Sequence, residues 1–197
     1  MAERKKPTKK AAPKKRGTRK KQPSLVERGW LWVRRVIWGA CFAALGFVLL
    51  ATLIYAIVPP PTTPYMLSER ARIGPVKYDW TPIEQIAPVM ARSAVAAEDA
   101  NFCLHWGLDV NAIRATLDRG GAGGASTISQ QTVKNVFLWH GRSWVRKAME
   151  AVWTPLTEAI WSKRRILEVY LNIAEFDEGV FGVQAAARHY FGVDAAD

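Results

Sequence analysis

Two glutamates are the strongest candidates for acid–base chemistry. Glu98 follows the apolar run 94–97, which would desolvate its carboxylate, and this is how a general acid or base is tuned for neutral pH. Glu150 lies beyond a glycine-rich turn and could face Glu98 across a groove, an arrangement used in sugar-transfer sites. Simpler alternatives stay open for both. Glu98 and Asp99 could be exposed residues at a helix end, and Glu150 could form an exposed ion pair with Arg146, four residues before it.

The segment between the two glutamates is rich in groups that bind anions. Gly123 and Gly124 lead to a helix start at Thr127, where free backbone N–H groups and hydroxyls suit an anionic oxygen, although a plain loop and N-cap would show the same residues. Four cations fall within fourteen residues of a domain whose net charge is near zero: Lys134, Arg142, Arg146 and Lys147. They predict a site for phosphate or diphosphate.

Uncharged polar residues share this segment with the cations. A buried polar group without a partner costs about 1–3 kcal/mol, so a segment that only formed core would not carry so many. They therefore indicate a groove, and the residues expected to shape it are Ser126, Thr127, Gln130, Gln131 and Asn135. His105, a lone histidine near Glu98, is expected to be structural and to donate to a neighbouring carboxylate or backbone group.

Helical patterns place these residues. Apolar residues recur at helical spacing from Pro82 to Glu98, Asp109 is a plausible N-cap, and residues 127–130 have a capping-box pattern. The helices expected are 82–98, 110–117, 127–138, 143–161 with a bend or interruption near Pro155, 163–173 and 180–190. Since no alternating strand pair and no repeat is evident, residues 81–197 are predicted to form one mostly α domain.

The N-terminal part of the chain has the pattern of a membrane anchor. Residues 36–58 are uncharged and apolar, and as a helix they would be about 34 Å long, enough to cross a hydrocarbon core of about 30 Å. Tryptophans near one end and a tyrosine near the other suit the membrane interfaces. Residues 1–35 are expected to be a disordered basic cytoplasmic tail and residues 59–80 a membrane-proximal linker, which puts the following domain outside the cytoplasm.

The distribution of charge argues against a nucleic-acid-binding domain. The formal net charge of +11 comes from residues 1–35, which hold 14 of the 28 basic residues but only two of the 17 acidic ones. The remaining 162 residues are almost neutral, so a binding face for nucleic acid is not expected on the folded part. Anionic lipid headgroups are a better match for the tail. The two cysteines, Cys41 and Cys103, predict neither a disulfide framework nor a zinc site.

Four ordered motifs between residues 98 and 172 resemble those of the peptidoglycan glycosyltransferases, family 51. They read E-D-x-x-F-x-x-H-x-G from Glu98, G-x-S-T-x-x-Q-Q-x-x-K-N from Gly124, R-K-x-x-E from Arg146, and K-x-x-I-x-E-x-Y-L-N from Lys163. A single anchor without a penicillin-binding domain is similar to the monofunctional biosynthetic members. The resemblance implies a lysozyme-like all-α fold with a jaw subdomain beside the membrane.

The resemblance also implies a reaction and its residues. Lipid II would be polymerised into β-1,4 glycan strands with inversion and release of undecaprenyl diphosphate, and Glu98 would take the proton of the acceptor hydroxyl. Lys134 and Arg142 would hold the donor diphosphate, with Arg146 and Lys147 near it. Glu150 would support the donor site or a divalent cation. Magnesium or manganese is the one cofactor that the resemblance suggests, and it implies no particular metal ligands. Partners implied are lipid II, the growing glycan strand, membrane lipids and proteins of cell division or cell-wall synthesis.

One departure from the family concerns the end of the chain. Family members continue with further helices and a last motif, whereas this sequence ends at Asp197, so a C-terminally truncated domain is expected. Two other functions are therefore weighed. A lysozyme-like lytic transglycosylase would need an acid but no cluster of cations, and a non-catalytic membrane scaffold would use a degenerate domain to bind cell-wall partners.

Overall fold

The structure is a computed structural model that describes residues 24–120, 124–141 and 143–197. The predicted disorder of residues 1–23 and the candidate anion-binding residue Arg142 lie outside these ranges. The chain divides into two compact units, residues 1–46 and 47–197, and the boundary between them falls within the first helix.

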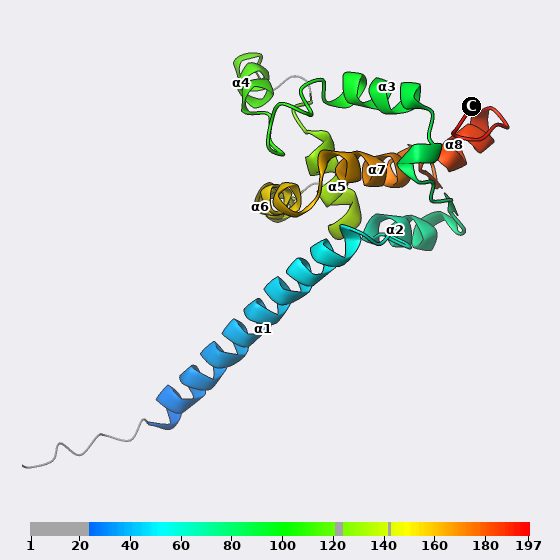
Figure 1. Ribbon diagram of the computed structural model, residues 1–197. Helices are drawn as coiled ribbons and strands as arrows, with labels where there is room; N and C mark the ends of the chain where they lie inside the picture. The colour runs from blue at the N-terminus through cyan, green and yellow to red at the C-terminus, as the bar shows by residue number, and fades with distance from the viewer. Residues whose placement is uncertain (1–23, 121–123, 142) are drawn as a thin grey trace, which may run out of the picture. The chain divides into compact units, whose positions relative to one another are not determined.

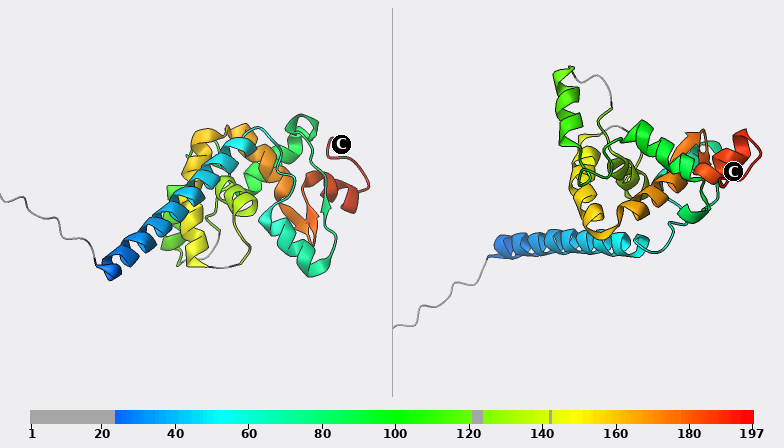
Figure 2. Two further views of the ribbon diagram at one scale, coloured as in Figure 1. Left: turned by 90° about the horizontal axis from the view of Figure 1, so that it is seen from below. Right: turned by 45° about the horizontal axis from the view of Figure 1, so that its top comes forward.

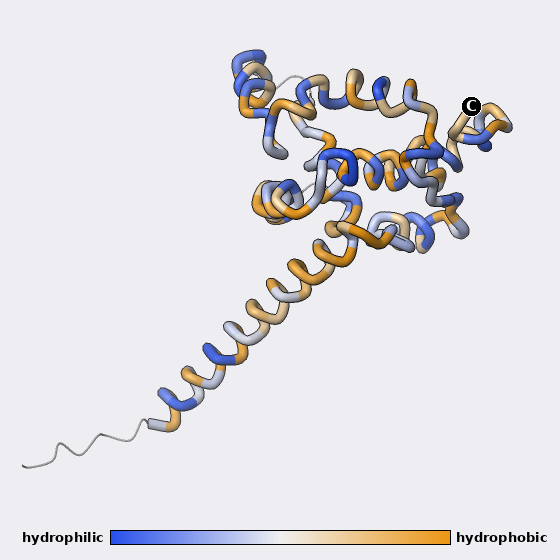
Figure 3. Tube along the Cα trace, viewed as in Figure 1, coloured by the Kyte–Doolittle hydropathy of each residue, from blue (hydrophilic) through white to orange (hydrophobic). Residues whose placement is uncertain are grey.

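The first helix, α1, spans Leu25–Tyr55. Among the described residues it is the one helix long and apolar enough to cross a membrane, and Figure 3 shows hydrophobic residues along most of its length. It begins well before residue 36, inside the segment expected to be a disordered tail. The reason is a capping box, in which the Ser24 N–H donates to Glu27 Oε2 at 2.6 Å and the Glu27 N–H donates to Ser24 Oγ at 3.2 Å.

Three helices form the centre of the second unit: α5 (Ile128–Phe137), α6 (Trp144–Ile160) and α7 (Lys163–Ile173). Helix α5 packs against both α6 and α7, and α3 (Pro88–Glu98) packs against α7 (Figure 1). Helix α4 (Val110–Asp118) stands away from these helices in Figures 1 and 2. The largest fully buried side chains of the main core come from all parts of this unit: Met66, Phe102, Ile128, Ile166, Leu171, Ile173 and Phe181.

Side-chain caps set the starts of the helices that carry the candidate site. Asp109 accepts a hydrogen bond from the Ala112 N–H at 2.8 Å at the start of α4. Ser143 and Ser162 do the same for the third residues of α6 and α7. At α5, Thr127 forms a capping box with Gln130. The helix starts predicted at Asp109, Thr127 and Ser143 are confirmed.

A small sheet closes one end of the unit and was not predicted. Its strands are β1 (Lys77–Tyr78), β2 (Glu175–Asp177) and β3 (Val180–Phe181), in the order β1-β3-β2. Strand β1 runs parallel to β3, and β2 runs antiparallel to it. The helix expected over 180–190 is therefore wrong in its first turn. Gly182 separates β3 from α8 (Val183–Tyr190).

Two other local predictions need correction. The segment 59–80, expected to be a linker, contains helix α2 (Pro64–Ile73), which is capped by Thr63 and buries Met66 in the core. Its polar residues hid the helical period from the sequence pattern. Helix α6 is continuous through Pro155, so the interruption considered there is absent. The prediction of a mostly α fold is confirmed.

Candidate active site

Glu98 is the last residue of α3 and its carboxylate is exposed. The expectation that the preceding alanines and valine would desolvate this carboxylate is wrong, because the exposed face of α3 carries the glutamate. Gln131 Nε2 on α5 donates to Glu98 Oε2 at 2.9 Å, so the carboxylate has a fixed neighbour across the gap between the two helices. Tyr170 lines the same cavity as Glu98, and burial, followed by the negative charge of Glu98, raises the pKa of its phenol to about 12.

Asp99 next to Glu98 is buried and holds the local backbone together. Its Oδ1 atom lies 2.8 Å from His105 Nε2, and its Oδ2 atom accepts from the Ile128 N–H at 3.0 Å. Asp99 therefore ties the end of α3 to the first residue of α5, and the structural role predicted for His105 is confirmed. The alternative in which Asp99 is an exposed helix-end residue is wrong.

Three side chains near the end of α3 form a candidate cation cluster. Ligand atoms of Asp99, His105 and Asp109 lie within 4.8 Å of one another. Both oxygens of Asp109 already accept hydrogen bonds, from the Ala112 N–H and from Asn101 Nδ2, as do both oxygens of Asp99. The trio fits a hydrogen-bonded scaffold better than a set of metal ligands.

Thr127 joins the start of α5 to the loop after α3. Its hydroxyl donates to the Gly107 carbonyl at 2.6 Å and accepts from the Gln130 N–H at 3.2 Å, while Gln130 Oε1 accepts from the Thr127 N–H at 3.1 Å. Thr127 and Gln130 are buried, so they support the site from beneath. Gly107 has φ +85, and a Cβ there would lie 2.7 Å from Thr154 Cγ2, which leaves only glycine able to let the loop approach α6.

The remaining groove residues divide by exposure. Ser126 is exposed at the start of α5, Gln131 is partly exposed, and Asn135 is buried. Ser129 was not predicted as a site residue. It hydrogen-bonds Glu158 of α6, a buried carboxylate that also accepts from Lys163 Nζ at 2.7 Å. A polar residue at this helix position was visible in the sequence, but its partner was not.

Glu150 lies on α6 with two cations around it. Arg146 Nη1 donates to its Oε2 atom at 2.8 Å, and Lys147 pairs with its Oε1 atom. The side chain of Glu150 is only 3% exposed, so the exposed ion pair considered as an alternative is in fact buried. Because the carboxylate is occupied by these two cations, it does not fit the role of a ligand for a divalent cation.

Lys134 on α5 lies between Glu98 and the α6 cluster that surrounds Glu150. Burial lowers the pKa of its ammonium, while the carboxylate of Glu150 opposes that shift, the charges of Arg146 and Lys147 add to it, and Glu98 opposes it more weakly. Lys134 is thus within electrostatic reach of both candidate glutamates. Helix α5 presents Gln131 to Glu98 and, one turn later, Lys134 to the cluster on α6, and this spacing makes the helix the shared wall of the site.

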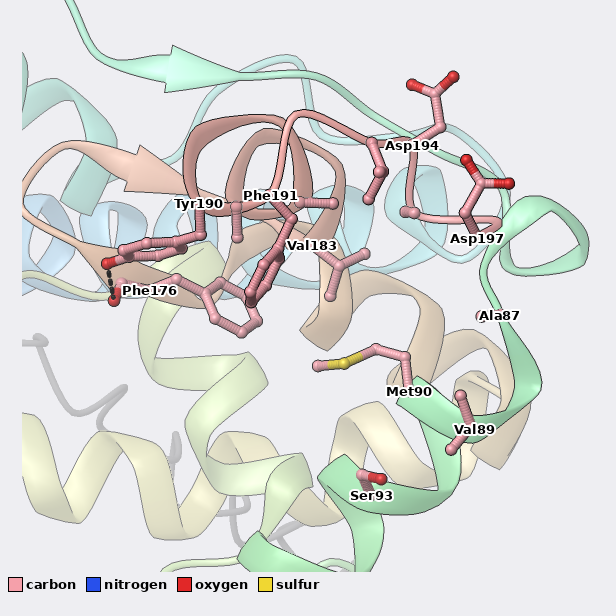
Figure 4. Close-up of a pocket in the computed structure, with 14 residues that line it drawn as sticks. Ala87, Val89, Met90, Ser93, Phe176, Val183, Tyr190, Phe191, Asp194 and Asp197 are labelled. Carbon is pink, nitrogen blue, oxygen red and sulfur yellow. Dashed lines mark hydrogen bonds between the residues drawn. The ribbon is translucent and has the colours of Figure 1, made fainter.

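One cavity adjoins Glu98 and another adjoins the cations of α6. The first, of about 260 Å³, is lined by Glu98, Ser93 and Tyr170 together with apolar residues of α3 and α7. It shares Met90, Ser93 and Phe176 with an apolar cavity of about 320 Å³ between α3 and α8, which Figure 4 shows. The second, an open cavity of about 270 Å³, is lined by Ser143, Trp144, Arg146 and Lys147. Both Glu98 and the two α6 cations therefore border open space.

Comparison with known proteins decides the family. A family model described as Transglycosylase matches residues 67–197. The chain belongs to the transglycosylase family. It is 62% identical over 167 residues to the biosynthetic peptidoglycan transglycosylase of Jannaschia sp. (strain CCS1), covering 84% of this chain and 68% of that protein.

Two further transglycosylases agree with this assignment. The chain is 47% identical over 184 residues to the biosynthetic peptidoglycan transglycosylase of Pseudomonas putida (strain GB-1), covering 88% of this chain and 75% of that protein. It is 46% identical over 179 residues to that of Yersinia pestis (strain Pestoides F), covering 85% of this chain and 73% of that protein. The chain is therefore a glycosyltransferase of peptidoglycan synthesis.

Proposed function

We propose that this transglycosylase joins lipid II units by an inverting displacement with Glu98 as the general base. The acceptor hydroxyl attacks C1 of the donor sugar, the new O–C1 bond forms, and the bond from C1 to the diphosphate oxygen breaks. The hydroxyl proton passes to the Glu98 carboxylate. The exposure of that carboxylate supports this role, because an acceptor hydroxyl can reach it directly.

The leaving diphosphate is held by cations on the other side of α5. Lys134, Arg146 and Lys147 converge there, and among the residues that the structure describes only the carboxylate of Glu150 pairs with the two α6 cations. The excess of positive charge would stabilise the negative charge that develops on the departing diphosphate. This electrostatic stabilisation is the larger catalytic contribution in such sites. Arg142, which lies outside the described residues, is proposed for the same cluster from its place in the sequence.

The observation that carries the proposal is the placement of α5 between the two groups. Gln131 contacts Glu98, and Lys134 lies in the field of both Glu98 and Glu150. A lytic enzyme that cuts the polymer has no diphosphate to bind and would not need the cations. The proposed steps use the side chains alone, and a divalent cation stays a prediction of the family resemblance.

Replacing Glu98 by Gln tests the base directly. The amide keeps the size of the side chain and its contact with Gln131 but cannot accept the proton, so polymerisation of labelled lipid II is expected to fall by about 10²–10⁴-fold. Products would be separated by size and identified by digestion with lysozyme. Glu84→Gln is the matched control, since Glu84 pairs with Arg164 on the surface away from the site. Full activity of Glu98→Gln, with an unchanged circular dichroism spectrum, would reject the assignment.

We further propose the location of the enzyme. Helix α1 anchors it in the cytoplasmic (inner) membrane as a single span, with the N-terminus in the cytoplasm and residues 59–197 outside. The apolar helix and the basic residues before it support this orientation. Binding to proteins of cell division or cell-wall synthesis stays a prediction from the family resemblance.

A further inference from the structure

The last turns of α1 share a buried contact with the helices of the site. Thr52 is fully buried, although it lies in the apolar stretch of α1. Trp153 Nε1 on α6 donates to Thr52 Oγ1 at 3.0 Å, and Trp161 Nε1 donates to the Thr52 carbonyl at 2.7 Å. The hydroxyl in turn donates to the Val48 carbonyl at 2.8 Å. One threonine of the anchor thus satisfies two indole N–H groups of the domain.

Phe137 completes this contact on the side of α5. Its ring stacks on Trp153 with centroids 4.6 Å apart, and it also touches the rings of Trp161 and Tyr55 at 6.1 and 6.0 Å. We call Thr52, Phe137, Trp153 and Trp161 the anchor layer. It joins α1, α5 and α6 through side chains that are buried or half-buried.

The anchor layer lies one turn from Lys134 on α5 and one turn from Glu150 on α6. Lys134 precedes Phe137 by three residues on α5, and the Leu138 N–H donates to the Lys134 carbonyl at 3.1 Å. Glu150 precedes Trp153 by three residues on α6, and Thr154 Oγ1 donates to the Glu150 carbonyl at 2.7 Å. The layer therefore packs between the same turns of α5 and α6 that bring Lys134 to Glu150.

A second set of contacts fixes the end of α1. Arg165 on α7 donates to the Tyr55 carbonyl from Nε and Nη2, both at 3.0 Å, and to the Val58 carbonyl at 2.8 Å. The guanidinium is held by Glu168 at 2.6 Å and lies over the ring of Trp80. A cation at a helix C-terminus satisfies carbonyls that have no partner within the helix. The final turn of α1 is thereby bound to the unit that carries the site.

We propose that the anchor layer positions the anion site, so that the last turns of α1 act as a structural part of the diphosphate-binding groups and not only as a tether. This inference rests on the proposed function of Lys134, Arg146 and Lys147. An indole N–H without a partner costs free energy where water is scarce, so loss of the Thr52 hydroxyl should let Trp153 shift. That shift would pass to Phe137 and to the turn of α5 that carries Lys134.

Thr52→Val is the test, because valine keeps the shape of threonine but cannot accept the Trp153 N–H. We expect it to weaken binding of undecaprenyl diphosphate in detergent about fivefold, the equivalent of one lost hydrogen bond, at a temperature where both proteins are folded. Thr52→Ser restores the hydroxyl and should bind as the parent does. Leu53→Val, on the exposed side of the same helix, is the control for altered anchor packing. Unchanged affinity in Thr52→Val, with a lowered melting temperature, would show that the layer only stabilises the fold and would overturn the proposal.

A second measurement separates failure of this inference from failure of the proposed function. Hydrogen exchange at the amides of residues 135–138 reports on the turn of α5 without any ligand. Faster exchange in Thr52→Val than in Thr52→Ser is expected, whether or not the cations bind diphosphate. If Lys134→Ala binds undecaprenyl diphosphate as tightly as the parent, the proposed function fails. Equal exchange in the two Thr52 variants would reject the positioning role itself.

Discussion

Lys134 holds its positive charge in partly desolvated surroundings, between a buried carboxylate and two further cations. Burial lowers the pKa of its ammonium below the usual value for lysine, and the charges of Arg146 and Lys147 act in the same direction. A bound diphosphate would oppose both effects. The empty site therefore favours loss of the proton, and the substrate favours its retention, so that binding and protonation of Lys134 are linked.

This linkage predicts how diphosphate binding depends on pH. Because the pKa is lowered, Lys134 should lose its proton at a lower pH than an exposed lysine, and affinity should fall as the pH rises through that range. Lys134→Arg keeps a positive charge throughout the range. We expect the variant to retain at alkaline pH the binding that the parent loses, measured as the dissociation constant of undecaprenyl diphosphate against pH. Superimposable pH profiles would contradict the assignment of this residue to the anion site.

At the scale of elements, helix α5 depends on its N-cap residue, Thr127. Thr127 satisfies the Gln130 N–H and also donates to the Gly107 carbonyl, so one side chain both caps the helix and fixes the loop that follows Glu98. Asp99 adds a third link through the Ile128 N–H. The N-terminal turn of α5 is thus bound to the end of α3, and this sets the separation of Glu98 and Gln131.

Removing this cap should lower the free energy of unfolding more than an ordinary surface substitution does. Thr127→Ala is expected to lower the free energy of unfolding by about 1–2 kcal/mol, since it removes the cap and leaves a buried carbonyl without its donor. Thr127→Ser keeps both bonds and should lose much less. Urea denaturation of the detergent-solubilised chain, followed by circular dichroism, measures the difference. Equal stability of the two variants would mean that the loop contact contributes nothing.

The sequence predicted those elements whose signals are local. Thr127 with Gln130, and Ser143 before α6, are patterns of a few residues, and both mark helix starts. Helix α2 and the sheet were not predicted, because Met66 and Phe181 become apolar contacts only when distant parts of the chain meet. A two-residue strand such as β1 has no period to detect.

In the candidate site, too, local signals were predicted and contacts between distant residues were not. Glu98, Lys134 and Glu150 could be named from motifs, but the burial of Glu150 and the exposure of Glu98 could not, since exposure depends on which face of a helix the rest of the fold covers. The pairing of Ser129 with Glu158 was missed for the same reason. Residue types indicated the chemistry, and only the packed helices showed the surroundings.

At the scale of the whole molecule, the two cysteines test the proposed orientation. Both are exposed in the structure, Cys41 on the apolar helix and Cys103 in the loop after α3. A maleimide that cannot cross membranes is expected to label Cys103 in intact spheroplasts and to leave Cys41 unlabelled within the bilayer. The Cys103→Ser variant should lose the label. If labelling requires permeabilised cells, the domain faces the cytoplasm and the proposed orientation is wrong.

The parallel pairing of β1 with β3 joins Lys77 to Val180, and the anchor layer joins Thr52 to Trp161. During synthesis, the residues next to the anchor leave the ribosome about a hundred residues before their partners. Contacts of such large sequence separation form slowly and late. In the orientation proposed above, these contacts cannot form until the residues up to Phe181 have crossed the membrane, and until then Thr52 and Lys77 lack their partners.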